Sequence, residues 1–313
     1  MRPMLSVLLA VAVTAGCLWF LLTPEILKSL GRLATEAQLL PILAAFMLGA
    51  LVQWLRAWRF AVMTTGRLAL PGVALVRIAF QLNGLNFLLP FRLGELSYPV
   101  LMRRHYGYSL LHSAGVLLLA RLFDLATVGA ILVAAAAMLH LAVGVNRVVL
   151  VLGALGLVVA PFGLALAARA LRLRMAQSSG TGEVAARLTA GLAAIGDRHV
   201  AMTAVALGFA IWLVFGFAAI LVAHAVVATV SPGAAMLGAA AGNIAFALPI
   251  NGIAGIGPAQ AAWVVATMWA GVPRDDAVMS ALALHAVVLT NAIVLGALAT
   301  ITGLGRKSPA SNT

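Results

Sequence analysis

The stretch NFLLPFRLGELSYP, residues 86–99, combines two helix breakers with two charges in a highly apolar part of the chain. Pro90 can end an incoming helix, and Gly94 allows the backbone to turn and to approach another segment closely. Arg92 beside the N-terminus of an outgoing helix would form an anion site, for which a lipid phosphate is the most available ligand. Glu95 would lie in the first turn of that helix, where the helix dipole favours a carboxylate.

A second pair of charges, Arg121 and Asp124, lies well inside a long apolar segment. Three positions apart on a helix, the two side chains share one face. Charges at such a depth are costly unless they are paired or hydrated, and by default they mark a site or a pathway. The alternative is a self-contained pair that locks the helix against its neighbour. Glu95 could pair with Arg121 or engage a cationic headgroup, and the sequence leaves both open.

The second half of the chain repeats the helix-breaking pattern without the charges. No Asp, Glu, Lys or Arg occurs from 201 to 272, and Pro249, Gly255 and Gly257 interrupt the apolar run there. Polar side chains in such a region are, taken singly, typical of hydrogen bonds between helices. Three of them gain weight because they recur at positions related to the first half, namely Asn243, Gln260 and His285.

The composition of the chain is that of a membrane protein. Of its 313 residues, 64% are hydrophobic and only 9% are charged, whereas an ordinary soluble domain is about 25% charged. We therefore expect an all-α polytopic membrane protein. The net charge of +12 would suggest nucleic acid in a soluble protein. Basic residues also collect in cytoplasmic loops beside anionic headgroups, so we expect no nucleic-acid partner.

Six segments are long and apolar enough for membrane spans, each of which needs about 20 residues. They are 4–22, 39–58, 109–139, 147–169, 200–229 and 277–303. Two further apolar regions, 71–104 and 233–272, are interrupted near the middle by Pro and Gly. We therefore expect about six transmembrane helices plus two re-entrant helix pairs, with two ordinary proline-kinked helices as the alternative.

The basic residues orient these segments in the cell (inner) membrane. With both termini in the cytoplasm, most of the 20 Lys and Arg fall on the inside, as the positive-inside rule requires. The outside would hold Lys28, Arg32, Arg147 and Arg274. This orientation works only if the two broken regions enter the membrane from opposite sides.

Opposite entry predicts an inverted-topology repeat within a single membrane domain, 1–313. Repeat one would be 39–139 and repeat two 200–303. Residues 170–198 would form a cytoplasmic amphipathic linker between them, and 305–313 would be a disordered tail.

Motifs for catalysis are missing from the sequence. It has no Walker loop, no metal-ligand spacing of His and Cys, and no pair of carboxylates in a loop. We therefore expect no enzyme activity, no catalytic residues, no metal and no cofactor.

Four segments together resemble the lysylphosphatidylglycerol synthetase transmembrane-region family, which are flippase-like integral membrane proteins. These segments are NFLLPFRLGELSYPVLMRR, ARLFDLATVGAILV, NIAFALPINGIAGIGPAQAAWVVATMWAGV and ALHAVVLTNAIVLGAL. The first-half family pattern is matched by Asn86, Pro90, Arg92, Gly94, Glu95, Arg121 and Asp124. The second-half pattern is matched by Pro249, Gly255 and Gly257, but Gln260 stands where an acid is usual and His285 where an arginine is usual.

The resemblance implies movement of a phospholipid, glycolipid or polyprenyl-phosphate-linked headgroup between membrane leaflets. The residues named above, with Asn243, would bind the substrate. Aminoacyl transfer, which relatives perform with a fused cytoplasmic domain, is not expected here. The partners would be anionic or lipid-linked membrane lipids, and a homo-oligomer is compatible with the sequence. Two other functions stay open: an integral transferase acting on a lipid-linked substrate, with Glu95 or Asp124 as general base, and an ion-coupled carrier of a small solute.

Overall fold

The computed structural model describes residues 2–24, 26, 37–141, 147–176, 198–248 and 250–303. Each predicted span corresponds to a helix in these ranges. The helices are α1 (Arg2–Leu21), α3 (Leu39–Thr65), α6 (Leu110–Met138), α7 (Arg147–Ala176), α9 (Arg198–Val226) and α12 (Arg274–Ile301). Among the residues searched, α3, α6, α9 and α12 are long and apolar enough to cross a membrane. The prediction of an all-α polytopic membrane protein is confirmed.

Both regions expected to be broken consist of two helices joined by irregular backbone. The first comprises α4 (Val73–Leu88), the 3₁₀ segment η1 (Pro90–Leu96) and α5 (Ser97–Tyr106). The second comprises α10 (Pro232–Ala247), the 3₁₀ turn η3 (Ile253–Gly255) and α11 (Pro258–Trp269). Pro90 and Pro258 stand at the start of the segment that follows each break, where a missing N–H costs nothing. Pro249, also expected to break the second region, lies outside the described residues.

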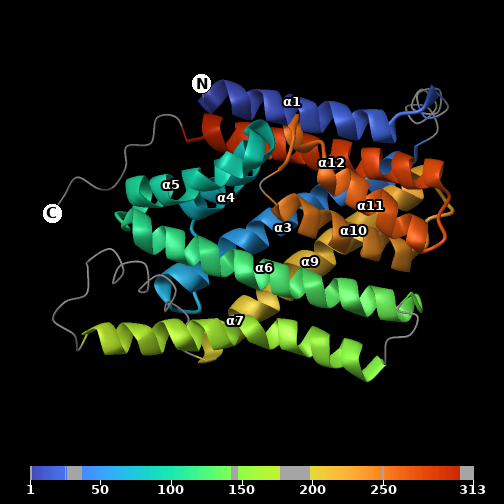
Figure 1. The fold of residues 1–313 in the computed structure, drawn as a ribbon. Helices are drawn as coiled ribbons and strands as arrows, with labels where there is room; N and C mark the ends of the chain where they lie inside the picture. The colour runs from blue at the N-terminus through green and yellow to red at the C-terminus, as the bar shows by residue number, and fades with distance from the viewer. Residues whose placement is uncertain are drawn as a thin grey trace.

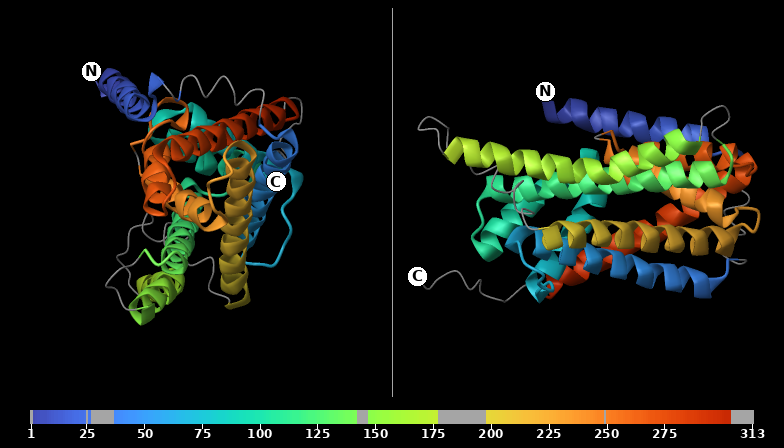
Figure 2. Two further views of the ribbon diagram at one scale, coloured as in Figure 1. Left: turned by 90° about the vertical axis from the view of Figure 1, so that its right-hand side faces the viewer. Right: turned by 90° about the horizontal axis from the view of Figure 1, so that it is seen from below.

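The two broken regions point toward opposite ends of the bundle (Figure 1). Helices α4 and α5 lie toward the end where α1 begins and α12 finishes, whereas α10 and α11 lie toward the other end. At the centre α3 packs along α9, while α4 packs on α12 and α10 packs on α6. Helices α7 and α1 lie at opposite edges of this assembly (Figures 1 and 2), with α7 against α6 and α1 against α11.

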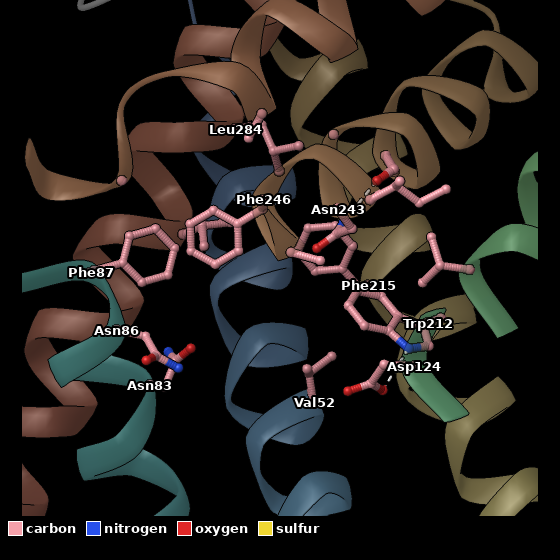
Figure 3. Close-up of a pocket in the computed structure, with 18 of the residues that line it drawn as sticks. Val52, Asn83, Asn86, Phe87, Asp124, Trp212, Phe215, Asn243, Phe246 and Leu284 are labelled. Atoms are coloured by element: carbon pink, nitrogen blue, oxygen red, sulfur yellow. Dashed lines mark hydrogen bonds between the residues drawn. The ribbon is translucent and has the colours of Figure 1, made fainter. Parts of the chain in front are cut away.

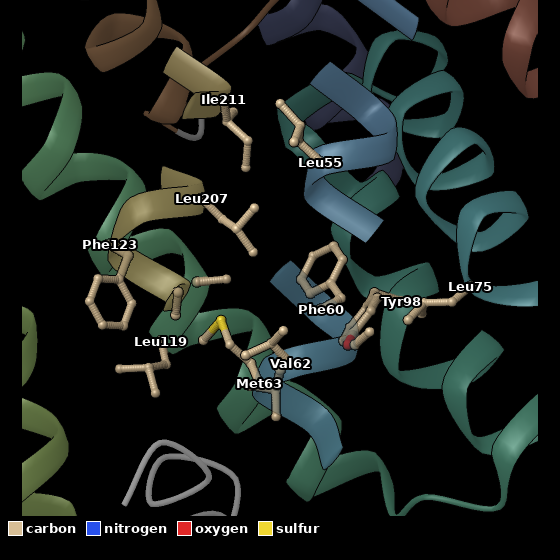
Figure 4. Close-up of a cluster of buried hydrophobic side chains, with 14 of the residues drawn as sticks. Leu55, Phe60, Val62, Met63, Leu75, Tyr98, Leu119, Phe123, Leu207 and Ile211 are labelled. Atoms are coloured by element: carbon tan, nitrogen blue, oxygen red, sulfur yellow. The ribbon is translucent and has the colours of Figure 1, made fainter. Parts of the chain in front are cut away.

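Close packing in the first half rests on a cluster of large apolar side chains from α3, α4, α5, α6 and α9 (Figure 4). Tyr98 of α5 is fully buried and stacks on Phe60 of α3 with ring centroids 4.4 Å apart. Elsewhere small residues allow close approach, as Gly84 of α4 does against Gly296 of α12. Large apolar side chains such as Leu40 and Met138 remain exposed, as a surface facing lipid requires.

Helix α3 is longer than the predicted span, because it ends at Thr65, where Gly66 adopts the left-handed conformation that terminates many helices. Arg59, just beyond the predicted end of the span at residue 58, therefore lies on the helix, as Arg56 does. Helix α7 likewise continues to Ala176. Most of the predicted linker and all of the predicted tail lie outside the described residues.

Candidate functional site

A cavity of about 620 Å³ lies in the middle of the bundle, between the two breaks. Its walls come from α3, α4, η1, α6, α9, α10, η3, α11 and α12. Nine of the predicted site residues line it: Asn86, Arg92, Glu95, Arg121, Asp124, Asn243, Gly255, Gln260 and His285. Gly94 and Gly257 shape the backbone beside it. Figure 3 shows Asn83 and Asn86 at one side of the cavity and Asp124 with Trp212 at the other.

Asp124 holds together three helices at the wall of this cavity. Its Oδ1 atom accepts hydrogen bonds from Nη1 of Arg59 at 2.7 Å and from Nε1 of Trp212 at 2.9 Å. Its Oδ2 atom lies 3.0 Å from Nη1 of Arg121. Both Arg59 and Asp124 are buried, so this carboxylate neutralises a guanidinium that water cannot reach.

Glu95 joins the first break to the same network. Its Oε1 atom lies 2.5 Å from Nη2 of Arg92 and 3.0 Å from Nε of Arg121. Of the two partners left open for Glu95, the structure has Arg121. The pairing of Arg121 with Asp124, considered as an alternative, is also present. The position of Glu95 differs from the expectation: it lies in η1, and α5 has no acidic residue in its first turn. Its carboxylate therefore meets arginines instead of the helix dipole.

The two breaks touch each other through Arg92. This residue has a positive φ of 57°, and its Nη1 donates to the backbone carbonyl of Phe246 at 3.3 Å. The guanidinium also lies 5.0 Å from the centroid of the Phe246 ring, within cation–π range. Phe246 in turn stacks on Phe87 at 5.3 Å, as Figure 3 shows. A displacement of one break would therefore change these contacts and the position of the other break.

The second break carries an uncharged counterpart of the Glu95–Arg121 pair. Gln260 Nε2 lies 2.8 Å from Nδ1 of His285, and Gln260 Oε1 accepts from the backbone N–H of Gly257 at 2.7 Å. In both halves a polar side chain in or just after the break thus pairs with one on the following long helix, Glu95 with Arg121 and Gln260 with His285. Asn243 of α10 donates to the carbonyl of Ala239 and faces the cavity.

Gly94 is required by the tight return of η1 over α4. A Cβ added there would collide with the backbone of Leu85 and Asn86. We expect Gly94→Ala to destabilise the protein by about 1–3 kcal/mol, because backbone must shift to relieve the overlap. Thermal unfolding in detergent measures this. Gly153→Ala is the matched control, since nothing lies within 4 Å of its added Cβ, and an unfolding temperature equal to that of Gly94→Ala would contradict the packing.

Gln260 stabilises the second break through its side-chain oxygen. We expect Gln260→Leu to cost about 1–3 kcal/mol, because it leaves the Gly257 N–H buried without an acceptor. Gln260→Glu keeps an acceptor for that N–H and should lose less. Equal unfolding temperatures for the leucine and glutamate variants would show that this hydrogen bond does not hold the break.

Three residues of the network were missed by sequence reasoning: Arg56, Arg59 and Trp212. The two arginines fall at the end of an apolar run, where basic residues ordinarily mark the cytoplasmic boundary. The signal that could have identified them is the apolar stretch FAVM, residues 60–63, which continues the helix beyond them. Trp212 carries no sequence signal, because its role depends on α9 packing beside α6.

Comparison with known protein families gives one match. The chain matches the family model described as "Lysylphosphatidylglycerol synthase TM region" over residues 7–296. Neither the comparison with curated proteins nor that with solved structures returned a match.

Proposed function

Because this chain belongs to the family of the lysylphosphatidylglycerol synthase TM region, we propose that it is a lipid transporter. It would move a phospholipid, glycolipid or polyprenyl-phosphate-linked headgroup between the leaflets of the cell membrane. The observation that carries the proposal is the central cavity, which combines charged and amide side chains with aromatic rings inside an apolar bundle. Such a cavity would let a polar headgroup cross the membrane without the cost of entering hydrocarbon.

An inverted repeat would provide the two access states that transport needs. Its support is the reciprocal packing, with α4 on α12 and α10 on α6. The polar pairs made at each break, the Glu95–Arg121 ion pair and the Gln260–His285 hydrogen bond, support it as well. In transporters of this kind one repeat rocks against the other around a site near the bilayer midplane. The end with α4 and α5 would face the cytoplasm, and α10 and α11 would gate the outer side.

Each charged group has a role in this proposal. Arg92 and Arg121 would bind the headgroup as it enters past the first break, and Glu95 would hold both guanidinium groups in place. The contact between Arg92 and Phe246 would close the route between the two breaks. The substrate would open this route by displacing Arg92 from Phe246. Transport of this kind forms no covalent bond, so the protein would act as a carrier and not as an enzyme.

A leaflet-exchange assay tests the function. The purified protein is reconstituted in vesicles that contain a trace of headgroup-labelled lipid, and a membrane-impermeant quencher reports how much label is in the outer leaflet. We expect the protected inner fraction to disappear faster than in protein-free vesicles or in vesicles with heat-denatured protein. A protected fraction equal to that of protein-free vesicles, across phosphatidylglycerol, phosphatidylethanolamine and polyprenyl phosphate, would contradict the proposal. Chemical conversion of the labelled lipid without exchange would indicate a transferase.

A further inference from the structure

The charges that line the cavity do not balance. Three guanidinium groups, those of Arg56, Arg92 and Arg121, face it together with two carboxylates, those of Glu95 and Asp124. Arg59, buried behind the wall, adds a further positive charge to the same network. The described residues of α10, η3, α11 and α12 that line the cavity supply amides and an imidazole but no carboxylate. The cavity therefore has an excess of positive charge.

Both carboxylates are already engaged by protein cations. Asp124 contacts Arg59, Arg121 and Trp212, and Glu95 contacts Arg92 and Arg121. A cationic headgroup would find no carboxylate that is not already paired with arginine. It would also have to approach the guanidinium groups in a region of low dielectric, where repulsion between like charges is strong.

Of the three arginines that line the cavity, Arg56 is the one that no carboxylate of the described residues contacts. Its guanidinium carbon lies 5.4 Å from the centroid of the Trp212 ring, and its Nε is buried with no hydrogen-bond partner. Among the described residues its side chain makes no ion pair. Arg56 shares a helical face with Gln53, which lies one turn earlier and also lines the cavity. The site thus presents a charged donor with unused hydrogen-bonding capacity.

We propose that Arg56 is the anchor for a phosphate group and that the site selects anionic phospholipid headgroups while rejecting cationic ones. The proposal rests on the lipid transport proposed above and names the substrate class of the same cavity. A phosphate oxygen would accept hydrogen bonds from the guanidinium of Arg56, and its negative charge would neutralise the excess positive charge of the cavity wall. Trp212 would hold the guanidinium in place through its ring while its N–H remains on Asp124.

Lipid binding to the purified protein, measured by native mass spectrometry, tests the selectivity without requiring transport. The probes are phosphatidic acid, phosphatidylglycerol, phosphatidylcholine, an ethyl-phosphatidylcholine that carries a net positive charge, and inorganic phosphate. We expect the two anionic lipids to bind at least tenfold more tightly than phosphatidylcholine, and the cationic lipid to bind most weakly. If millimolar inorganic phosphate displaced the anionic lipids, the site would be assigned to a free anion instead of a lipid.

The Arg56→Gln variant should lose about tenfold in affinity for the anionic lipids and keep the affinity for phosphatidylcholine. Arg56→Lys should retain most of the preference, since it retains the charge, and so guards against a folding defect in the glutamine variant. Arg67→Gln, which removes an exposed arginine just beyond α3, is the control. Equal binding of anionic and cationic lipids by the wild-type protein, or an unchanged preference in Arg56→Gln, would overturn the proposal.

The two proposals fail in different ways. Anionic preference that depends on Arg56, without leaflet exchange, would refute transport and leave the site assignment standing. Exchange that proceeds equally for anionic and cationic lipids would support transport and refute the selectivity.

Discussion

Replacing Asp124 with asparagine is expected to destabilise the protein by about 3–5 kcal/mol, because it leaves a buried charge without its partner. Arg59 has only 1% of its side chain exposed and forms its one ion pair within the described residues with Asp124. The substitution also weakens the contacts to Arg121 and to Trp212. Unfolding of the purified protein by heat or by denaturing detergent measures the loss.

Two comparisons separate this effect from a general loss of stability on substitution. The double variant Arg59→Met with Asp124→Leu removes both charges together and should recover the part of the loss that the unpaired Arg59 causes, since apolar replacement of a buried pair is often neutral. The contacts of Arg121 and Trp212 with Asp124 stay lost in it. Asp275→Asn, whose carboxylate is 61% exposed at the start of α12, should cost less than about 1 kcal/mol. An Asp124→Asn variant as stable as Asp275→Asn would contradict the buried network.

Substitution of Arg121 by glutamine is expected to slow leaflet exchange by about tenfold or more. Arg121 is the residue that joins the two carboxylates, and its side chain is still 24% exposed toward the cavity. In the proposed role Arg121 binds the headgroup, and loss of one charge-assisted hydrogen bond to it, worth about 1.5–3 kcal/mol, corresponds to at least that factor. The exchange rate is compared at equal amounts of folded protein.

Further variants show whether slower exchange is specific to the charged residues of the cavity. Arg92→Ala and Glu95→Gln should also slow exchange, because they touch the same network, whereas Arg103→Gln removes an exposed charge at the end of α5 and should not. If Arg92→Ala, Glu95→Gln and Arg121→Gln all left exchange at the wild-type rate, the cavity would not be the transport site.

The helices and the breaks could be predicted from the sequence because they follow from local chemistry. Apolar runs set α6 and α9, Pro90 ends α4, and Gly94 permits the close return of η1. The spacing of Arg121 and Asp124 also fixed their contact, since residues three apart on a helix face the same way.

The partners that lie far apart in the chain could not be predicted in the same way. The contact of Arg59 with Asp124 depends on how α3 packs beside α6 and α9, and neither residue carries a local sign of the other. Arg56 looked like a cytoplasmic boundary residue because it stands two residues before the predicted end of the span at residue 58, whereas α3 continues to Thr65. The contact of Arg92 with Phe246 requires the two breaks to meet, which spacing within each half does not specify.

In the proposed mechanism a lipid headgroup occupies the cavity between the two breaks. Photocrosslinking with a phosphatidylglycerol analogue that carries a diazirine beside its phosphate, followed by identification of the labelled peptides, tests this occupancy. We expect labelling of cavity-lining residues around Arg56, Arg121 and Trp212, and we expect an excess of unlabelled phosphatidylglycerol to suppress it. Labelling confined to outward-facing residues such as Leu40 and Met138, with none in the cavity, would contradict it.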